Sequence, residues 1–70
     1  MNKTSDLWFS SFLIVISKNP VIGQERVGKK VYFIFDIDNE EWDRLKFEFF
    51  NSSLSKIKQE QERLKDLILN

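Results

Sequence analysis

Carboxylates crowd one short segment of the sequence, and this segment has the strongest potential for metal-ion or acid–base chemistry. Its members are Asp36, Asp38, Glu40, Glu41 and Asp43. Calcium takes several oxygen ligands, but the EF-hand loop needs glycine at its sixth position and glutamate at its twelfth. Those positions hold Glu41 and Phe47 here. The spacing of Asp38 and Glu41 instead predicts a capping box, with Asp38 as the N-cap of a helix.

Basic and aromatic residues lie next to one another in a second segment. Arg26, Lys29 and Lys30 precede Tyr32 and Phe33. Cations for phosphates and rings for base stacking are what single-stranded nucleic acid requires, and the segment loosely resembles the RNP1 consensus without its second small residue. The 11 Lys and Arg balance 11 Asp and Glu, which disfavours strong phosphate binding. A solubilising turn is therefore the favoured interpretation, and nucleic-acid contact through Arg26, Lys29, Lys30 and Tyr32 is the alternative.

The chain has 70 residues and contains neither histidine nor cysteine. This excludes disulfides, cysteine- or histidine-bound zinc, thiol nucleophiles and the most common general base. The Ser, Lys, Asp and Glu residues form no recognisable catalytic arrangement, so we expect a protein that is not an enzyme and has no cofactor. A chain without cysteine fits a reducing compartment, and we expect it in the cytoplasm.

The hydrophobic pattern predicts one α+β domain over residues 1–70, in the order α-β-β-α-α, with one antiparallel β-hairpin packed by helices. The expected elements are a helix over about 5–17, a hairpin over about 21–37 and helices over about 39–50 and 53–69. Thr4, Ser5 and Asp6 are good N-caps for the first helix, and Asn19-Pro20 ends it. Gly28 opens a two-residue turn that favours type II′.

The stretch over residues 7–16 is interrupted only by Ser10 and Ser11. A membrane span needs about 20 apolar residues, and a signal peptide needs a basic leader and a cleavage site, so we expect neither. The stretch predicts a helix that is apolar, and hence buried, nearly all round. A chain of this length has little material with which to surround such a helix.

The strand expected over residues 30–37 has two apolar faces. One face carries Val31, Phe33, Phe35 and Ile37, and the other carries Tyr32, Ile34 and Asp36. A hairpin with one solvated face alternates apolar with polar residues, and this strand does not. Helices cover one face, and the other requires more helix or a second copy. Because short chains without staples usually need a partner, we expect a homodimer.

The last expected helix carries a narrow stripe with steps of three and four residues. Its members are Leu54, Ile57, Gln61, Leu64 and Ile68, and a polar residue such as Gln61 sets register in a coiled coil. The stripe either folds back on the hairpin or pairs with its copy, and its geometry fits both. The favoured function is a protein–protein interaction or assembly module. Its expected interface residues are Trp8, Leu13, Ile34, Phe47, Leu54, Ile57 and Leu64.

Several short motifs resemble a small uncharacterised family of bacterial, archaeal and phage proteins, classified as a domain of unknown function. The motifs are Lys3-Thr4-Ser5-Asp6-Leu7, Phe12-Leu13, Gly28 before Val31-Tyr32-Phe33-Ile34-Phe35, Phe49-Phe50-Asn51-Ser52 and Leu64-Lys65-Asp66-Leu67. Val15, Ile16 and Ser17 stand where the family has a glycine-containing helix end. The resemblance implies a stand-alone domain from a microbe or its phage, and it implies no activity.

Overall fold

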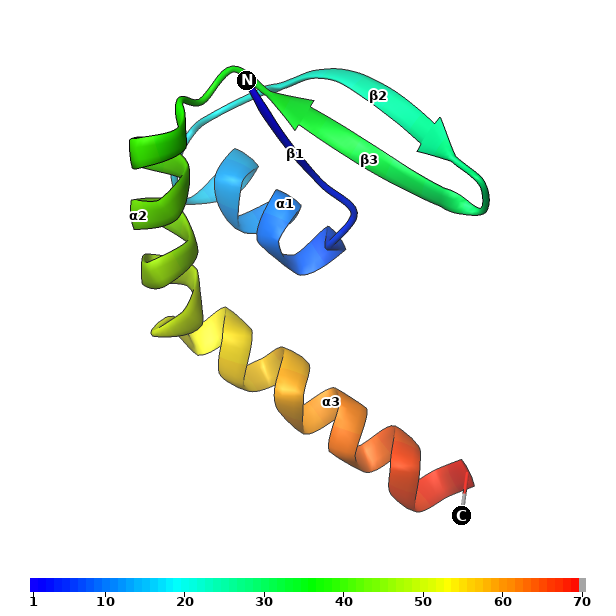
Figure 1. Cartoon of the computed structure of the whole chain (residues 1–70). Coiled ribbons are helices and arrows are strands. Elements are labelled where there is room, and N and C mark those ends of the chain that lie inside the picture. The colour runs from blue at the N-terminus through cyan, green and yellow to red at the C-terminus, as the bar shows by residue number, and fades with distance from the viewer. Residues whose placement is uncertain (70) are drawn as a thin grey trace.

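The chain folds into an antiparallel sheet flanked by helices (Figure 1). This computed structural model describes residues 1–69. In chain order the elements are β1 (Asn2–Thr4), α1 (Leu7–Val15), β2 (Val21–Val27), β3 (Lys30–Phe35), α2 (Asn39–Phe50) and α3 (Ser53–Leu69). The α+β class and the predicted order are confirmed, with one short strand added before the first helix.

The added strand β1 extends the predicted hairpin into a sheet with the order β1-β3-β2. Its register places Lys3 opposite Ile34 and Thr4 opposite Phe33. A polar segment of three residues has neither the alternation nor the β-branched residues that mark a strand in a sequence. Its backbone pairs with β3, and the side chain of Asn2 donates to the carbonyl of Ile37 at 2.9 Å, so β3 becomes the central strand.

The helix α1 is shorter than predicted at both ends. Asp6 is its N-cap, and Oδ1 of Asp6 accepts hydrogen bonds from the amides of Trp8 and Phe9 at 2.8 and 3.1 Å. The last helical residue is Val15. Lys18 then adopts a left-handed conformation with φ of 59°, and the amide of Asn19 donates to the carbonyl of Leu13 at 2.8 Å. The chain therefore leaves the helix before Asn19-Pro20 is reached.

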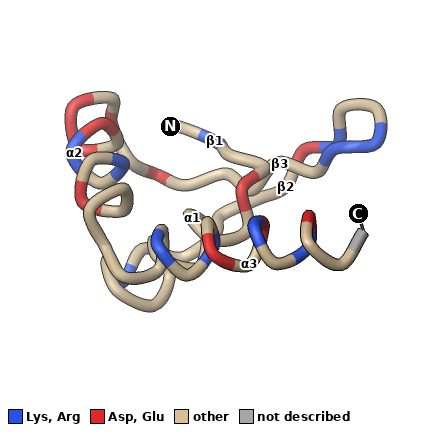
Figure 2. Tube along the Cα trace, turned by 90° about the horizontal axis from the view of Figure 1, so that it is seen from below, with Lys and Arg blue, Asp and Glu red and all other residues tan. Residues whose placement is uncertain are grey.

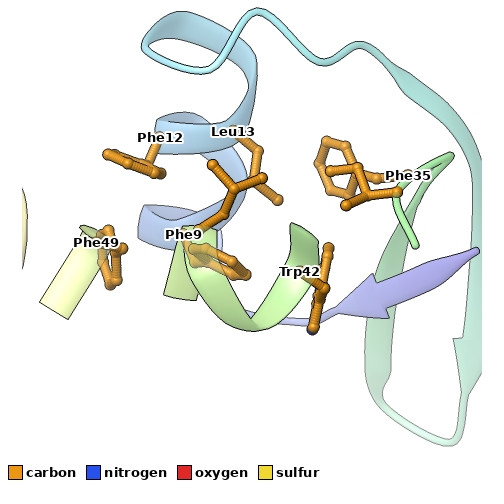
Figure 3. Close-up of a cluster of buried hydrophobic side chains, with 8 residues drawn as sticks. Phe9, Phe12, Leu13, Phe35, Trp42 and Phe49 are labelled. Atoms are coloured by element: carbon orange, nitrogen blue, oxygen red, sulfur yellow. The ribbon is translucent and has the colours of Figure 1, made fainter. Parts of the chain in front are cut away.

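The hydrophobic core lies between α1, α2 and the helix-facing side of the sheet (Figure 3). The rings of Phe9 and Trp42 meet edge to face at 5.1 Å between centroids, and those of Phe12 and Phe49 at 5.6 Å. Such pairs add to the stability gained by burial. The core consists of Phe9, Phe12, Leu13, Phe35, Ile37, Trp42, Leu45 and Phe49.

Leu13 belongs to this core and is not an interface residue, so that prediction is wrong. Its side chain is 0% exposed. Phe9 precedes it by one helical turn, which puts both side chains on the face of α1 that meets the core. Within the single chain α1 is buried on one side only, because Leu7, Ile14 and Val15 are exposed on its opposite face.

The second apolar face of β3 is partly covered within the same chain. Tyr32 and Ile34 are half-buried on this face. Lys3 of β1 forms an ion pair with Glu25 of β2, at 2.9 Å between Nζ and Oε2, and the two residues flank Ile34. The ion pair therefore shields Ile34 in part, and Ile34 still lines an open hollow with Met1 and Asn2.

The helix α3 packs against α1 and α2 through its first turns and then runs away from the rest of the molecule (Figure 1). Ser55 is buried and Leu54 packs on the core. Among the described side chains after Ser55, only Lys58 is half-buried and the others are exposed. Most of α3 therefore lacks a packing partner in its own chain.

Candidate interaction surface

Apolar side chains that are exposed or half-buried lie along α1 and α3, and we call this set the apolar strip. Leu7, Trp8, Ser11 and Leu54 line a shallow hollow of about 220 Å³ at the place where the two helices meet. Beyond Leu54 the strip continues along α3, where Ile57 and Leu64 are 47% and 46% exposed. The strip consists of Leu7, Trp8, Leu54, Ile57, Leu64 and Ile68.

The strip extends from α1 toward the sheet. A second hollow, of about 140 Å³, lies beside the first and shares Leu7 and Ser11 with it. Ile14 of α1 and Phe33 of β3 complete its walls. Leu7, Ser11 and Ile14 follow at steps of four and three, so they share the face of α1 that points away from the core.

The serines of α1 do not make this surface polar. Oγ of Ser11 donates a hydrogen bond to the carbonyl of Leu7, and Oγ of Ser10 donates to the carbonyl of Asp6, each at 2.8 Å. Serine in a helix commonly donates to the carbonyl one turn before it. With the hydroxyl hydrogen used in this way, Ser11 presents mainly its small size, and Leu7 is left 65% exposed beside it.

An ion pair fixes the angle at which α3 leaves α1. Nζ of Lys58 lies 2.8 Å from Oδ2 of Asp6, and each side chain is about one-third exposed. Partial burial acts to raise the pKa of Asp6. The hydrogen bond and charge of Lys58 and the amides of Phe9 and Trp8 outweigh it, so this pKa lies below its ordinary value. The helix N-cap and the α3 contact thus share one carboxylate.

Of the residues predicted from the sequence, Trp8, Leu54, Ile57 and Leu64 come together in the strip. Phe47 is 72% exposed, but it lies on the outer face of α2. Ile34 lies on the sheet face that the Lys3–Glu25 pair covers. The interface residues predicted from the sequence are therefore distributed over three separate surfaces and, for Leu13, the core.

The exposed apolar residues outside the predicted interface set include Leu7 and Phe50. Leu7 belongs to the helix expected to be buried. The exposed polar residue on its face is Ser11, four residues later, which marks the edge of the apolar face less clearly than a charge would. Phe50 is 68% exposed and lines two hollows with Asp6 and Phe49.

The basic residues of the hairpin gather at its tip, as Figure 2 shows. Arg26, Lys29 and Lys30 are all exposed, and no ion pair involves them within residues 1–69. Tyr32 is half-buried, with Nζ of Lys3 5.1 Å from its ring centroid. The register pairs Arg26 with Val31 and Glu25 with Tyr32, so Arg26 and Tyr32 lie on opposite faces of the sheet.

The carboxylate segment forms a helix start, as predicted. Oδ1 of Asp38 accepts a hydrogen bond from the amide of Glu41 at 2.8 Å, and Glu41 pairs with Arg44. Within the described part of the chain, no three carboxylates converge closely enough to hold a metal ion.

No family model, curated protein or solved structure matches the chain. The resemblance to the uncharacterised microbial family stays a prediction. The described helices include none with the length and the apolar character that a membrane span requires.

Proposed function

We propose that the protein is a non-enzymatic interaction module that assembles as a homodimer through the apolar strip. The observation that carries this proposal is the meeting of Leu7 and Trp8 with Leu54 in one apolar hollow, continued by Ile57 and Leu64. Large exposed apolar patches on small proteins mark surfaces that bind other molecules. A second copy is the proposed occupant because a chain of 70 residues has a small core of its own.

The compartment and source of the protein are also part of this proposal. The chain has no cysteine, which fits a reducing compartment, and its motifs resemble a microbial and phage family. We therefore propose that the homodimer is a cytoplasmic protein encoded by a prokaryote or by a phage.

The test is the molar mass in solution, measured by light scattering on a size-exclusion column over a wide concentration range. We expect a dimer mass for the natural protein and a monomer mass for Leu64→Asp. Val27→Asp is the matched control, because Val27 is similarly exposed, at 53%, but lies in the hairpin. A monomer mass for the natural protein at every concentration refutes the homodimer.

A second candidate function is nucleic-acid binding by the hairpin tip. It is favoured by three exposed cations, Arg26, Lys29 and Lys30, that have no carboxylate partner among the described residues. Binding of this kind weakens steeply with salt. We expect Lys29→Glu to abolish a mobility shift of single-stranded DNA or RNA at low salt, whereas Leu64→Asp leaves it intact. Absence of any shift by the natural protein removes this candidate.

A further inference from the structure

The apolar stripe of α3 has the spacing of a two-stranded coiled coil. Leu54, Gln61 and Ile68 take the a positions of a heptad, and Ile57 and Leu64 take the d positions. Ile57, Leu64 and Ile68 are exposed, and the C-terminal part of α3 extends beyond the other elements (Figure 1). This part of the stripe is thus open to a second helix.

The charges beside the stripe distinguish between the two possible orientations of that helix. Glu60 takes a g position and Lys65 the e position that follows five residues later. A parallel pair places g of one helix beside this e of the other, so Glu60 meets Lys65 with opposite charge on both edges. An antiparallel pair places g beside g and e beside e, so Glu60 faces Glu60 or Leu67, according to the register, and does not meet Lys65. The charges therefore favour a parallel pair.

Glu60 and Lys65 are both exposed on α3. The side chain of Glu60 is 56% exposed, and Arg63 of the same helix donates only to its Oε1. Oε2 of Glu60 accepts no hydrogen bond within the described residues. Lys58, at the other e position, pairs with Asp6 of its own chain and so adds little unpaired positive charge to the edge.

The rest of the apolar strip fits the same orientation. In a parallel pair, both domains lie at the same end of the coiled coil. The hollow formed by Leu7, Trp8 and Leu54 then lies next to the two-fold axis in both copies. Gln61 meets its copy at the centre, where the two amides pair, and a shift by one heptad would bury each amide against an apolar residue.

We infer that the occupant of the apolar strip is a second copy of this chain whose α3 lies parallel and in register, held by Glu60–Lys65 pairs on both edges. This inference rests on the proposed homodimer and adds the orientation and register to it.

The first test reverses the charges. We expect Glu60→Lys and Lys65→Glu each to weaken the dimer roughly tenfold, because two attractive contacts per dimer become repulsive. The double variant restores the natural affinity. Glu62→Lys is the matched control, since it makes the same charge change on another face of α3. In an antiparallel pair Glu60 and Lys65 do not face each other, so the double variant would not rescue the single variants.

The second test locates the helices directly. A disulfide needs Cα atoms about 4.4–6.8 Å apart, and parallel pairing brings the two copies of position 64 face to face. The chain has no natural cysteine, so Leu64→Cys reports on this position alone. We expect mild oxidation to link the Leu64→Cys dimer covalently, and the control Glu62→Cys to remain unlinked.

The outcomes separate the inference from the function on which it rests. A natural protein that is dimeric, with no rescue by the double variant and no link at position 64, overturns the parallel pairing and leaves the homodimer standing. A monomeric natural protein refutes both. A dimer that shows the charge rescue and the link at position 64 supports both.

Discussion

Lys3 and Glu25 join the two edge strands across the central strand β3. Nζ of Lys3 lies 2.9 Å from Oε2 of Glu25 and 5.1 Å from the centroid of the Tyr32 ring. The register places Lys3 opposite Ile34, so the aliphatic stem of Lys3 lies along the apolar face that helices leave open. A long charged side chain can cover apolar surface in this way and keep its charge in water.

The stem of Lys3 contributes more to stability than its charge does. An exposed ion pair is worth about 0–1 kcal/mol, and the Lys3 and Glu25 side chains are nearly half exposed. Lys3→Met keeps the stem, and we expect it to change the free energy of unfolding by less than about 0.5 kcal/mol. Lys3→Ala uncovers Ile34 and lowers the free energy of unfolding by about 1 kcal/mol. Urea denaturation measures both, and equal losses would assign the effect to the charge.

Leu13 holds the core together, and its substitution affects folding rather than association. We expect Leu13→Ala to lower the free energy of unfolding by about 2–5 kcal/mol, because it leaves a cavity among Phe9, Phe12 and Phe35. The control Leu67→Ala removes the same atoms from a side chain that is exposed, and its effect stays within about 0.5 kcal/mol. Denaturation at one fixed protein concentration compares the two. Similar losses would contradict the core position of Leu13.

The predictable part of the fold was set by local signals. Asp38 and Glu41 have capping-box spacing and begin α2 as predicted, and Gly28 has the positive φ, 61°, of the expected turn. The strand β1 was not predictable, because its pairing with β3 depends on residues about thirty positions away and its own residues are polar. The second face of β3 was expected to need cover from a helix or a second copy, because the sequence did not reveal that Lys3 of β1 lies opposite Ile34.

The α3 part of the candidate surface was predictable from the sequence, and the α1 part was not. The stripe of α3 is visible as a heptad pattern, and its exposure follows because α3 extends past the domain. Leu7 and Leu13 have the same residue type in the same helix, and the amphipathic pattern of α1 is too weak to separate them. Which face of α1 meets the core depends on where α2 and the sheet lie, and that is decided by packing across the whole chain.

Lys18 stores backbone strain at the end of α1. Its φ of 59° is left-handed, a conformation that costs a residue with a side chain about 1–2 kcal/mol and costs glycine almost nothing. We expect Lys18→Gly to raise the midpoint of thermal unfolding by several degrees, even after the greater freedom of glycine in the unfolded chain is counted. Lys18→Ala keeps the strain and serves as the control. A gain with alanine as large as with glycine would show that the lysine charge is responsible.

The Asp6–Lys58 pair makes the attachment of α3 sensitive to acid. The folded protein holds the pKa of Asp6 below its ordinary value of 3.8, which the unfolded chain keeps. The ionised carboxylate therefore stabilises the fold in full at pH values above the pKa of the unfolded chain. This contribution is lost as the pH falls through the lower, folded pKa. At neutral pH it is of the order of 1 kcal/mol, since the pair is one-third exposed.

Asp6→Asn isolates this contribution, because asparagine is as good an N-cap as aspartate but carries no charge. We expect the natural protein to be more stable than the variant at pH 7, and the difference to shrink below about pH 5 and vanish below the folded pKa. Urea denaturation over a pH series measures this difference. Lys58→Met should remove most of it at neutral pH while leaving the bonds from the Trp8 and Phe9 amides in place. A difference that persists unchanged to pH 2 would show that Asp6 acts through its cap geometry and not through its charge.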